Sequence, residues 1–321
     1  MKHVDQRGED KHAVTLEATS LERISARPLP AASMFPRTHY FEIDSGKAGA
    51  RYAVWVTTPT SYDQEPDRRF PAIYSPDGNR NTALAAGLCD LNEWDFMDPF
   101  QATIQICVGY TDEDAGRALA VRARDLLPPK EALPSGMVEN MRNGVDNGLL
   151  DPAGIELYIH NLENPAGDRF LTFLTEELHP FICRTYRIET NSIGLFGHSY
   201  GGLFATYAAL QDATIFRNFG ASSPGILVDR SVIFDLYADA VAKGGLSDRH
   251  LHMTVAAREI TDPGIYQPMV AGGTVEFMRL AGTTPLKGLT FSSRLFEDET
   301  HITVKPAAMH SFLRAFYLRH S

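Results

Sequence analysis

The first elements along the chain are predicted by the alternation of apolar and polar side chains. Such alternation at residues 38–43 and 51–56 indicates two strands, and the polar turn Asp44–Lys47 between them suits an antiparallel hairpin. Continuous apolar runs, which are typical of strands buried on both faces, follow at 70–74 and 103–109. The amino-terminal third is therefore expected to supply four strands of one sheet.

Helical spacing of apolar residues begins at Asp168 and continues to Cys183, with Asp168 near the start as a candidate N-cap. From there on, strands and helices alternate. We expect further strands at 193–196, 219–223, 251–256 and 289–296, and further helices at 203–210 and 306–318. This alternation predicts an α/β fold of the α/β-hydrolase type, with a mostly parallel central sheet, helices on both faces and the N-terminal antiparallel hairpin.

The chain is predicted to form one large domain. Its 321 residues can bury a single core, and no linker or internal repeat divides them. Residues 1–35 are polar and contain prolines, so we expect an N-terminal arm followed by a single domain at 36–321. Within this domain the periodicity loosens from about 111, and Pro and Gly signals predict an insertion or lid at about 130–165.

Composition narrows the classes of function. The formal net charge of −10 gives no general basic field, so nucleic acid is not expected as a partner. The polar N-terminus has no apolar stretch after it and no run of 18 apolar residues occurs, so we predict a cytoplasmic protein without membrane insertion. The three cysteines are widely spaced in apolar surroundings, and no cluster suggests a metal or another cofactor.

The most informative motif is Gly197-His198-Ser199-Tyr200-Gly201, which lies between a strand-length apolar run and a helix-forming run. In a nucleophile elbow the serine sits in strained backbone geometry between strand and helix, so that its hydroxyl projects above the sheet. Glycines on either side let the strand and the helix approach each other closely. The sequence therefore predicts Ser199 as an acyl-group nucleophile.

A serine hydroxyl needs an imidazole to accept its proton, and chain order in this fold is serine, acid, histidine. Chain order or position argues against the other histidines, at 3, 12, 39, 160, 179, 198, 250, 252, 310 and 320. His301 remains, in the loop directly after the last expected strand, where a carboxyl-end loop can reach the serine. We therefore expect His301 to be the catalytic base.

The acid that orients the histidine is expected after the strand at 251–256. Glu259 occupies this carboxyl-end loop and is preferred, and Asp262, three residues further on, is the alternative. Asp298 lies close to the histidine in sequence but departs from the expected chain order. The negative oxygen formed on acyl transfer needs two N–H donors, which are expected from Tyr200 and from the loop after the third strand.

That loop is Asp77-Gly78-Asn79, and Asn79 is the preferred second donor with Gly78 as the alternative. Taken alone, it would be a plain turn.

The chain resembles a known family in several motifs. The stretches around Asp77–Asn79, Ser199 and His301, together with Arg122–Asp125, Phe170–Phe181 and Ser222–Pro224, resemble in order the motifs of the esterase D-like α/β-hydrolases. The resemblance is closest to the branch with the trilactone siderophore esterases. The resemblance covers about residues 38–318 and implies a serine hydrolase of carboxylic esters with Ser199 and His301 as nucleophile and base.

Two features depart from the family pattern: Ala257-Arg258-Glu259 stands where a Gly-containing turn is usual, and the segment at about 130–165 is longer. If the substrate is an anionic trilactone, local cations are needed. The candidates are Arg80, Arg122, Arg124, Arg169 and Arg258, each of which could equally form structural or solvated ion pairs. The expected partner is a small-molecule ester. Acyl transfer by the same serine, hydrolysis of small acyl, aryl or thioesters, and a silent binding module are the alternatives.

Overall fold

The computed structural model describes residues 34–143, 151–228, 230–262 and 264–319. The chain divides into two compact units, one up to Pro36 and one from Arg37 onward, and all elements below belong to the second unit. The arm expected at 1–35 lies outside the described residues up to position 33.

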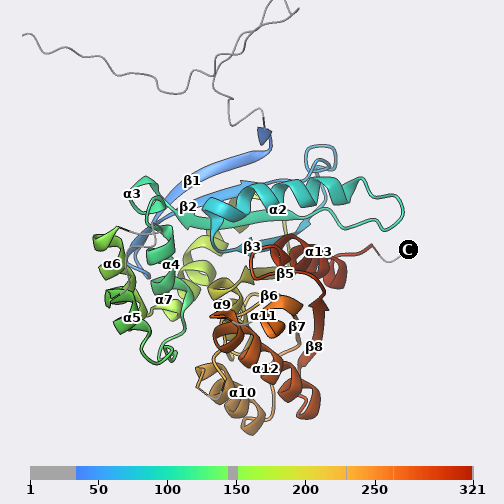
Figure 1. Cartoon of the computed structure of the whole chain (residues 1–321). Coiled ribbons are helices and arrows are strands. Elements are labelled where there is room, and N and C mark those ends of the chain that lie inside the picture. Colours follow the sequence, from blue (N-terminus) through green and yellow to red (C-terminus); the bar gives the residue numbers. More distant parts are fainter. Residues whose placement is uncertain (1–33, 144–150, 229, 263, 320–321) are drawn as a thin grey trace, which may run out of the picture. The chain divides into compact units, whose positions relative to one another are not determined.

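The described part of this unit contains one eight-stranded sheet in the order β1-β2-β4-β3-β5-β6-β7-β8 (Figure 1). Only the pairings of β2 with β1 and with β4 are antiparallel. The strands are β1 (Thr38–Ser45), β2 (Ala50–Thr57), β3 (Phe70–Ser75), β4 (Ile104–Tyr110), β5 (Ile188–His198), β6 (Asn218–Ser222), β7 (Arg249–Ala256) and β8 (Leu289–Phe296). The predicted mostly parallel sheet with an N-terminal antiparallel hairpin is confirmed.

Burial follows from the position of each strand in the sheet. All residues of β3, β4 and β6 are buried, as continuous apolar runs predict for strands covered on both faces. The edge strand β8 is exposed or half-buried along its whole length and carries polar residues such as Ser292 and Arg294. The central strands of the sheet are therefore buried, and the carboxyl ends of the parallel strands β3, β5, β6 and β7 lie at the same edge of the sheet.

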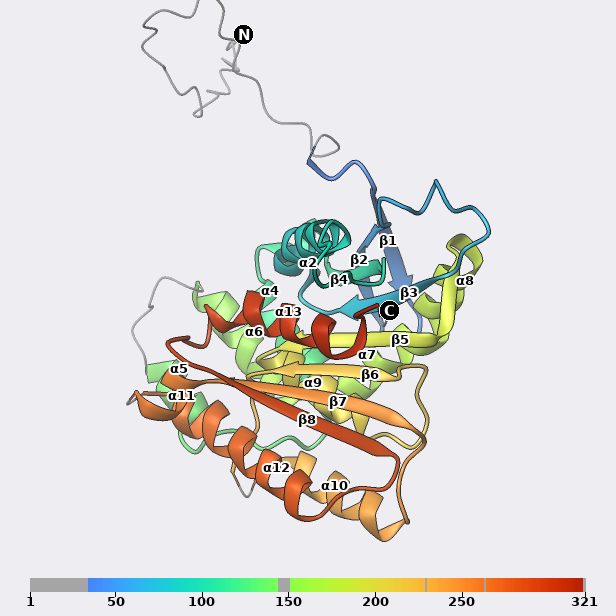
Figure 2. The same ribbon diagram turned by 90° about the vertical axis from the view of Figure 1, so that its right-hand side faces the viewer.

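Helices cover both faces of the sheet (Figure 2). On one face, α2 (Gly78–Glu93) and α13 (Val304–Phe316) pack with the strands around a core that includes Phe196 and Phe312. The larger core on the other face contains Phe204 and Phe277. It is covered by α4 (Ala118–Leu126), α6 (Pro152–Glu163), α7 (Gly167–Thr172), α9 (Tyr200–Ala209), α10 (Val232–Ala242) and α12 (Gly272–Thr283).

Several helices differ from the expectation. The helix expected at 168–183 is one helical run that begins with α7, continues through a π-helical turn at Phe173–Leu178 and ends with α8 (His179–Thr185). Its N-cap is Ala166, so the prediction of Asp168 as the cap was wrong by two residues. The helices α2, α10 and α12 were not predicted.

The loosened region between 111 and 165 contains helices in its described parts. These are α3 (Asp112–Ala115), α4, α5 (Met137–Asn143) and α6. The Asp151 side chain caps α6 by accepting a hydrogen bond from the Gly154 N–H. The role of residues 130–165 as a lid stays a prediction.

None of the helices in the described ranges combines the length and the apolar character that crossing a bilayer requires.

Candidate active site

The predicted nucleophile lies at the carboxyl end of β5, at the turn into α9. Ser199 has φ 60° and ψ −119°, a backbone conformation that side-chain-bearing residues rarely adopt. The turn is held from two sides, because the Ser199 N–H donates to the Ser222 carbonyl at 2.9 Å and its carbonyl accepts from the Gly225 N–H at 3.2 Å. The neighbouring loop after β6 therefore fixes the serine backbone.

The glycines around this turn are required by close backbone contacts. A Cβ at Gly197 would lie 1.9 Å from the Gly201 carbonyl oxygen, and a Cβ at Gly202 would lie 2.7 Å from the Ser222 carbonyl oxygen. Both contacts are far inside van der Waals distance, and backbone atoms cannot rotate away as side chains do. The close approach of β5, α9 and β6 thus depends on these glycines.

His301 and Glu259 form a buried hydrogen-bonded pair below the serine turn. The His301 Nδ1 lies 2.5 Å from the Glu259 Oε1, and both side chains are almost fully buried. The other carboxylate oxygen, Oε2, accepts from the Ser223 hydroxyl at 2.8 Å and from the Ala256 N–H at 2.9 Å. These contacts fix the carboxylate. Because its Oε1 occupies Nδ1 of His301, Nε2 is the imidazole nitrogen that remains available to the cavity.

The His301 ring is also held between two other rings. Tyr266 stacks on it with 4.1 Å between ring centroids, and His198 lies against it at 4.7 Å. The Nδ1 of His198 shares a hydrogen bond of 3.0 Å with the Ser222 hydroxyl. Burial holds the pKa of His198 well below its usual value. His198 is thus a neutral wall of the site.

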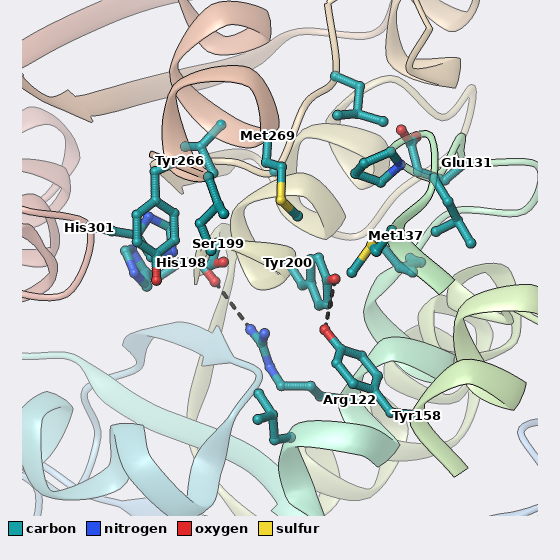
Figure 3. A pocket seen from close by; sticks show the side chains of 18 of the residues that line it. Arg122, Glu131, Met137, Tyr158, His198, Ser199, Tyr200, Tyr266, Met269 and His301 are labelled. Carbon is teal, nitrogen blue, oxygen red and sulfur yellow. Dashed lines mark hydrogen bonds between the residues drawn. The ribbon is translucent and has the colours of Figure 1, made fainter. Parts of the chain in front are cut away.

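Ser199 and His301 line the same cavity (Figure 3). Between these two described side chains there is no direct hydrogen bond. Catalytic hydrogen bonds in unliganded enzymes are often long and shorten only when substrate binds. The topology therefore brings the predicted nucleophile and base to one wall, 102 positions apart in the sequence.

The alternative acids lie elsewhere. Asp262 accepts from Arg258 at 2.8 Å in a pair that is about half exposed, and it does not contact His301. Asp298 is exposed in the turn after β8. The structure thus places Glu259, on the short helix α11 (Ala257–Thr261), as the carboxylate that contacts the histidine.

The two preferred oxyanion donors both line the cavity. Tyr200 is the first residue of α9 and Asn79 the second of α2, and the first N–H groups of a helix have no intrahelical acceptor. Gly78 is not part of the cavity wall. A Cβ at Gly78 would lie 2.8 Å from the Val108 backbone, so this glycine allows α2 to pack on β4.

Arg122 joins the two oxyanion segments. Its guanidinium donates to the Asp77 carboxylate at 2.7 and 2.8 Å and to the His198 carbonyl at 3.4 Å, and it lies over the Tyr200 ring at 5.0 Å (Figure 3). Burial alone would raise the pKa of Asp77, but Arg122, followed by Lys305 and Arg80, outweighs burial and the pKa is lowered. The Tyr200 hydroxyl is in turn 2.9 Å from that of Tyr158.

The cavity has a volume of about 800 Å³. This size suits a drug-sized ligand. Besides the residues above, its wall includes a buried carboxylate, Glu131, and a half-buried amine, Lys305, neither of which was predicted as a site residue. Lys305 follows His301 by four positions, which is the one sequence signal that could have indicated it. Among the described residues, no three His, Cys, Asp or Glu side chains lie together as metal ligands would.

The predicted substrate arginines divide into two groups. Arg80 and Arg122 line the cavity, whereas Arg124, Arg169 and Arg258 do not. Arg124 pairs with its neighbour Asp125 at 2.7 Å, and Arg169 is exposed on α7. The structure therefore brings two of the five arginines to the cavity.

Comparison with known proteins gives concordant matches. The Esterase family profile matches residues 45–233, more than half of the chain. The siderophore enterobactin esterase of Emericella nidulans is 27% identical over 57% of this chain and 56% of its own length. The ferri-bacillibactin esterase BesA of Bacillus subtilis is 26% identical over 88% of this chain and 90% of its own length. The chain thus spans just over half of the first relative and nearly all of the second.

Solved structures agree on the fold. The siderophore hydrolase EstB from Aspergillus nidulans superposes with a TM-score of 0.70 at 22% identity, covering 92% of this chain and 98% of that one. An IroE-like serine hydrolase from Shewanella oneidensis superposes with a TM-score of 0.65 at 22% identity, covering 87% of this chain and 79% of that one. With this fold and the match over residues 45–233, the chain belongs to the Esterase family of carboxylic ester hydrolases.

Proposed function

We propose that the protein hydrolyses carboxylic esters through an acyl-enzyme formed on Ser199, at a nucleophile elbow. The observation that carries the proposal is the His301 Nδ1 to Glu259 Oε1 contact of 2.5 Å beside a serine in strained geometry. Nδ1 donates to the carboxylate, so Nε2 can accept the Ser199 proton while Oγ attacks the ester carbonyl.

The developing negative oxygen is held by the N–H groups of Tyr200 and Asn79 at two helix N-termini. Collapse of the tetrahedral intermediate breaks the ester bond, and the protonated His301 gives its proton to the departing alcohol oxygen. Water, deprotonated by His301, then attacks the acyl-enzyme. The Ser199–acyl bond breaks and Oγ takes the proton back, which releases the carboxylic acid.

Siderophore esters are the first natural substrates to test, because the names of several relatives specify them. The protein is incubated with an enterobactin-type trilactone and with small aryl esters, and products are followed by mass spectrometry. Ring opening supports a siderophore substrate, and an intact trilactone beside hydrolysed aryl esters rejects it.

The serine mechanism has its own test. Labelling by a fluorophosphonate is expected on Ser199 in the wild type and lost in Ser199→Ala, together with several orders of magnitude in turnover of an activated aryl ester. Undiminished hydrolysis by Ser199→Ala contradicts the mechanism.

A cytoplasmic setting is part of the proposal. It is supported by three cysteines that are all unpaired, two of them buried.

A further inference from the structure

The cavity wall has two chemically different sides. Apolar side chains form most of it, and they come from α4 and the segment after it, from α6, from the segment after β6 and from the segment before α12. They are Leu119, Leu127, Leu133, Met137, Met141, Ile155, Leu227, Ile265, Met269 and Val270. Figure 3 shows Met137 and Met269 on either side of Tyr200, with Met137 across the cavity from His301. Such a surface favours an apolar group of the ligand over a hydrated one.

The charged side chains of the wall are unevenly distributed. Asp77 is engaged by Arg122 through two hydrogen bonds, so this pair is neutral as a unit. Arg80 and Lys305 come from the segments next to Asn79 and His301, and no described carboxylate lies within ion-pair distance of either. This corner therefore carries two cations that form no ion pair, the exposed Arg80 and the half-buried Lys305, and only the more distant Asp77 partly balances their charge, in a chain whose net charge is −10.

The environment of Lys305 shows how incomplete this corner is. Burial lowers the pKa of Lys305. Asp77 and, to a smaller extent, Cys107 raise it, whereas Arg122 and Arg80 lower it further. An anion beside Lys305 would compensate both the burial and the repulsion between the cations. The ordinary alternative, a solvated surface lysine, does not fit a half-buried side chain in the wall of a cavity.

The one acidic side chain on the apolar side of the described cavity wall, Glu131, offers an anion no counter-charge. Glu131 is buried, its Oε2 accepts from the Ser231 hydroxyl at 3.0 Å, and its Oε1 has no partner among the described residues. In Figure 3 it lies across the cavity from His301. A negative group of the ligand gains nothing beside this buried carboxyl and is attracted at Arg80 and Lys305, which fixes the orientation of the ligand.

We infer that the natural substrate is an amphiphilic ester, with a bulky apolar part held by the Met137–Met269 side of the cavity and an anionic group held by Arg80 and Lys305. The inference rests on the proposed ester hydrolysis and restricts its substrate. The anion can stand on the alcohol part or on the acyl part of the ester, and the two cases have the same recognition chemistry.

The test compares anionic esters with neutral partners of the same size. For an anion on the alcohol part the pair is para-octanoyloxybenzoate and its methyl ester, and for an anion on the acyl part it is monooctyl succinate and its methyl ester. One of the anionic esters is expected to exceed its neutral partner about tenfold in kcat/KM at low salt, as a charge-assisted contact allows. The preference should fall as the salt concentration rises.

Variants locate the preference. In the double variant Arg80→Met with Lys305→Met the ratio should fall to about one, mainly through KM, whereas Arg169→Met, an exposed arginine away from the cavity, should keep it. Replacing para-octanoyloxybenzoate by para-acetoxybenzoate should lower kcat/KM about threefold per methylene removed, until the apolar side is no longer occupied.

Equal turnover of the anionic and neutral esters, or a preference that survives the double variant, overturns the cationic part of the inference. No gain from the octanoyl chain overturns the apolar part. If fluorophosphonate labels Ser199 while none of these esters is hydrolysed, the substrate class is wrong and the serine mechanism stands. If the label does not react, the proposed function itself fails.

Discussion

The Arg122 guanidinium donates two hydrogen bonds to the Asp77 carboxylate and also reaches the carbonyl of the residue before Ser199. Asp77 has φ 58° and precedes the first turn of α2, so this ion pair fixes one oxyanion segment against the other. Arg122 was a candidate for binding substrate or for a structural ion pair, and from these contacts we propose a positioning role. Planar two-point contact of this kind is specific to arginine.

Arg122→Met is expected to lower kcat about 100-fold with little change in KM, because displaced oxyanion donors weaken only the transition state. Arg122→Lys should recover part of the loss. Since Arg122→Met alone leaves a buried charge at Asp77, the double variant with Asp77→Asn keeps the fold testable. Wild-type kcat in that double variant contradicts the positioning role, and the exposed Arg117→Met is the matched control.

Glu259→Gln is expected to lower kcat by a factor on the order of 1,000, because an amide cannot stabilise the imidazolium that forms on His301. The shape and most contacts of the side chain are kept, so thermal unfolding should change little. Asp262→Asn, on the alternative acid, should retain activity. A stopped assay with an aryl ester measures both, and the reverse order of effects would assign the acid to Asp262.

Glu131 makes the stability of the protein depend on pH. Burial raises the pKa of Glu131 to about 7, although the Ser231 hydroxyl lowers it. A raised pKa means that the folded state binds the proton more tightly than the unfolded one. The stabilisation of the folded state by protonated Glu131 is therefore complete below pH 4.5, which is the pKa of the unfolded state, and is lost as the pH rises to about 7.

The loss amounts to about 3 kcal/mol in the free energy of unfolding. In urea titrations at pH 5 and pH 8, wild type should lose this much more stability than Glu131→Gln. Glu139→Gln, an exposed glutamate of the same segment, should follow the wild type. Parallel changes in all three proteins would show that Glu131 ionises freely.

Two glycine substitutions should have opposite effects. Gly202→Ala places a Cβ 2.7 Å from the Ser222 carbonyl oxygen and should destabilise the protein by about 1–3 kcal/mol. Gly87 lies in the exposed middle of α2, where an added Cβ would meet no atom within 4 Å, so Gly87→Ala should stabilise by about 0.5–1 kcal/mol. Calorimetric melting of both variants checks the sign.

The sequence predicted the site where chemistry is concentrated at strand ends. Ser199 and Glu259 follow apolar strands and His301 follows the partly polar edge strand β8. Parallel strands bring their carboxyl ends together, so strand order was sufficient to predict that these three residues lie close to one another. Helix α2 was missed because its run of Gly, Asn and Ala residues has little amphipathic character. Its start depends on Asp77 in a left-handed conformation, which only the tertiary contact with Arg122 explains.

The charged residues of the cavity wall were harder to predict for a related reason. Lys305 and Glu131 carry no motif, and their importance comes from burial and from the lack of an ion-pair partner among the described residues, both of which depend on neighbours distant in sequence. Arg124, Arg169 and Arg258 showed the converse, since charge and approximate position in the sequence do not indicate which side of an element a residue occupies.

The rings of Tyr266 and His198 both lie against the His301 imidazole, and Glu259 occupies its Nδ1. These three contacts oppose rotation of the imidazole ring about its side-chain bonds. Proton transfer is thereby restricted to Nε2, which serves both the serine and the departing group. A reagent that alkylates imidazoles would likewise find only this nitrogen of His301 to attack.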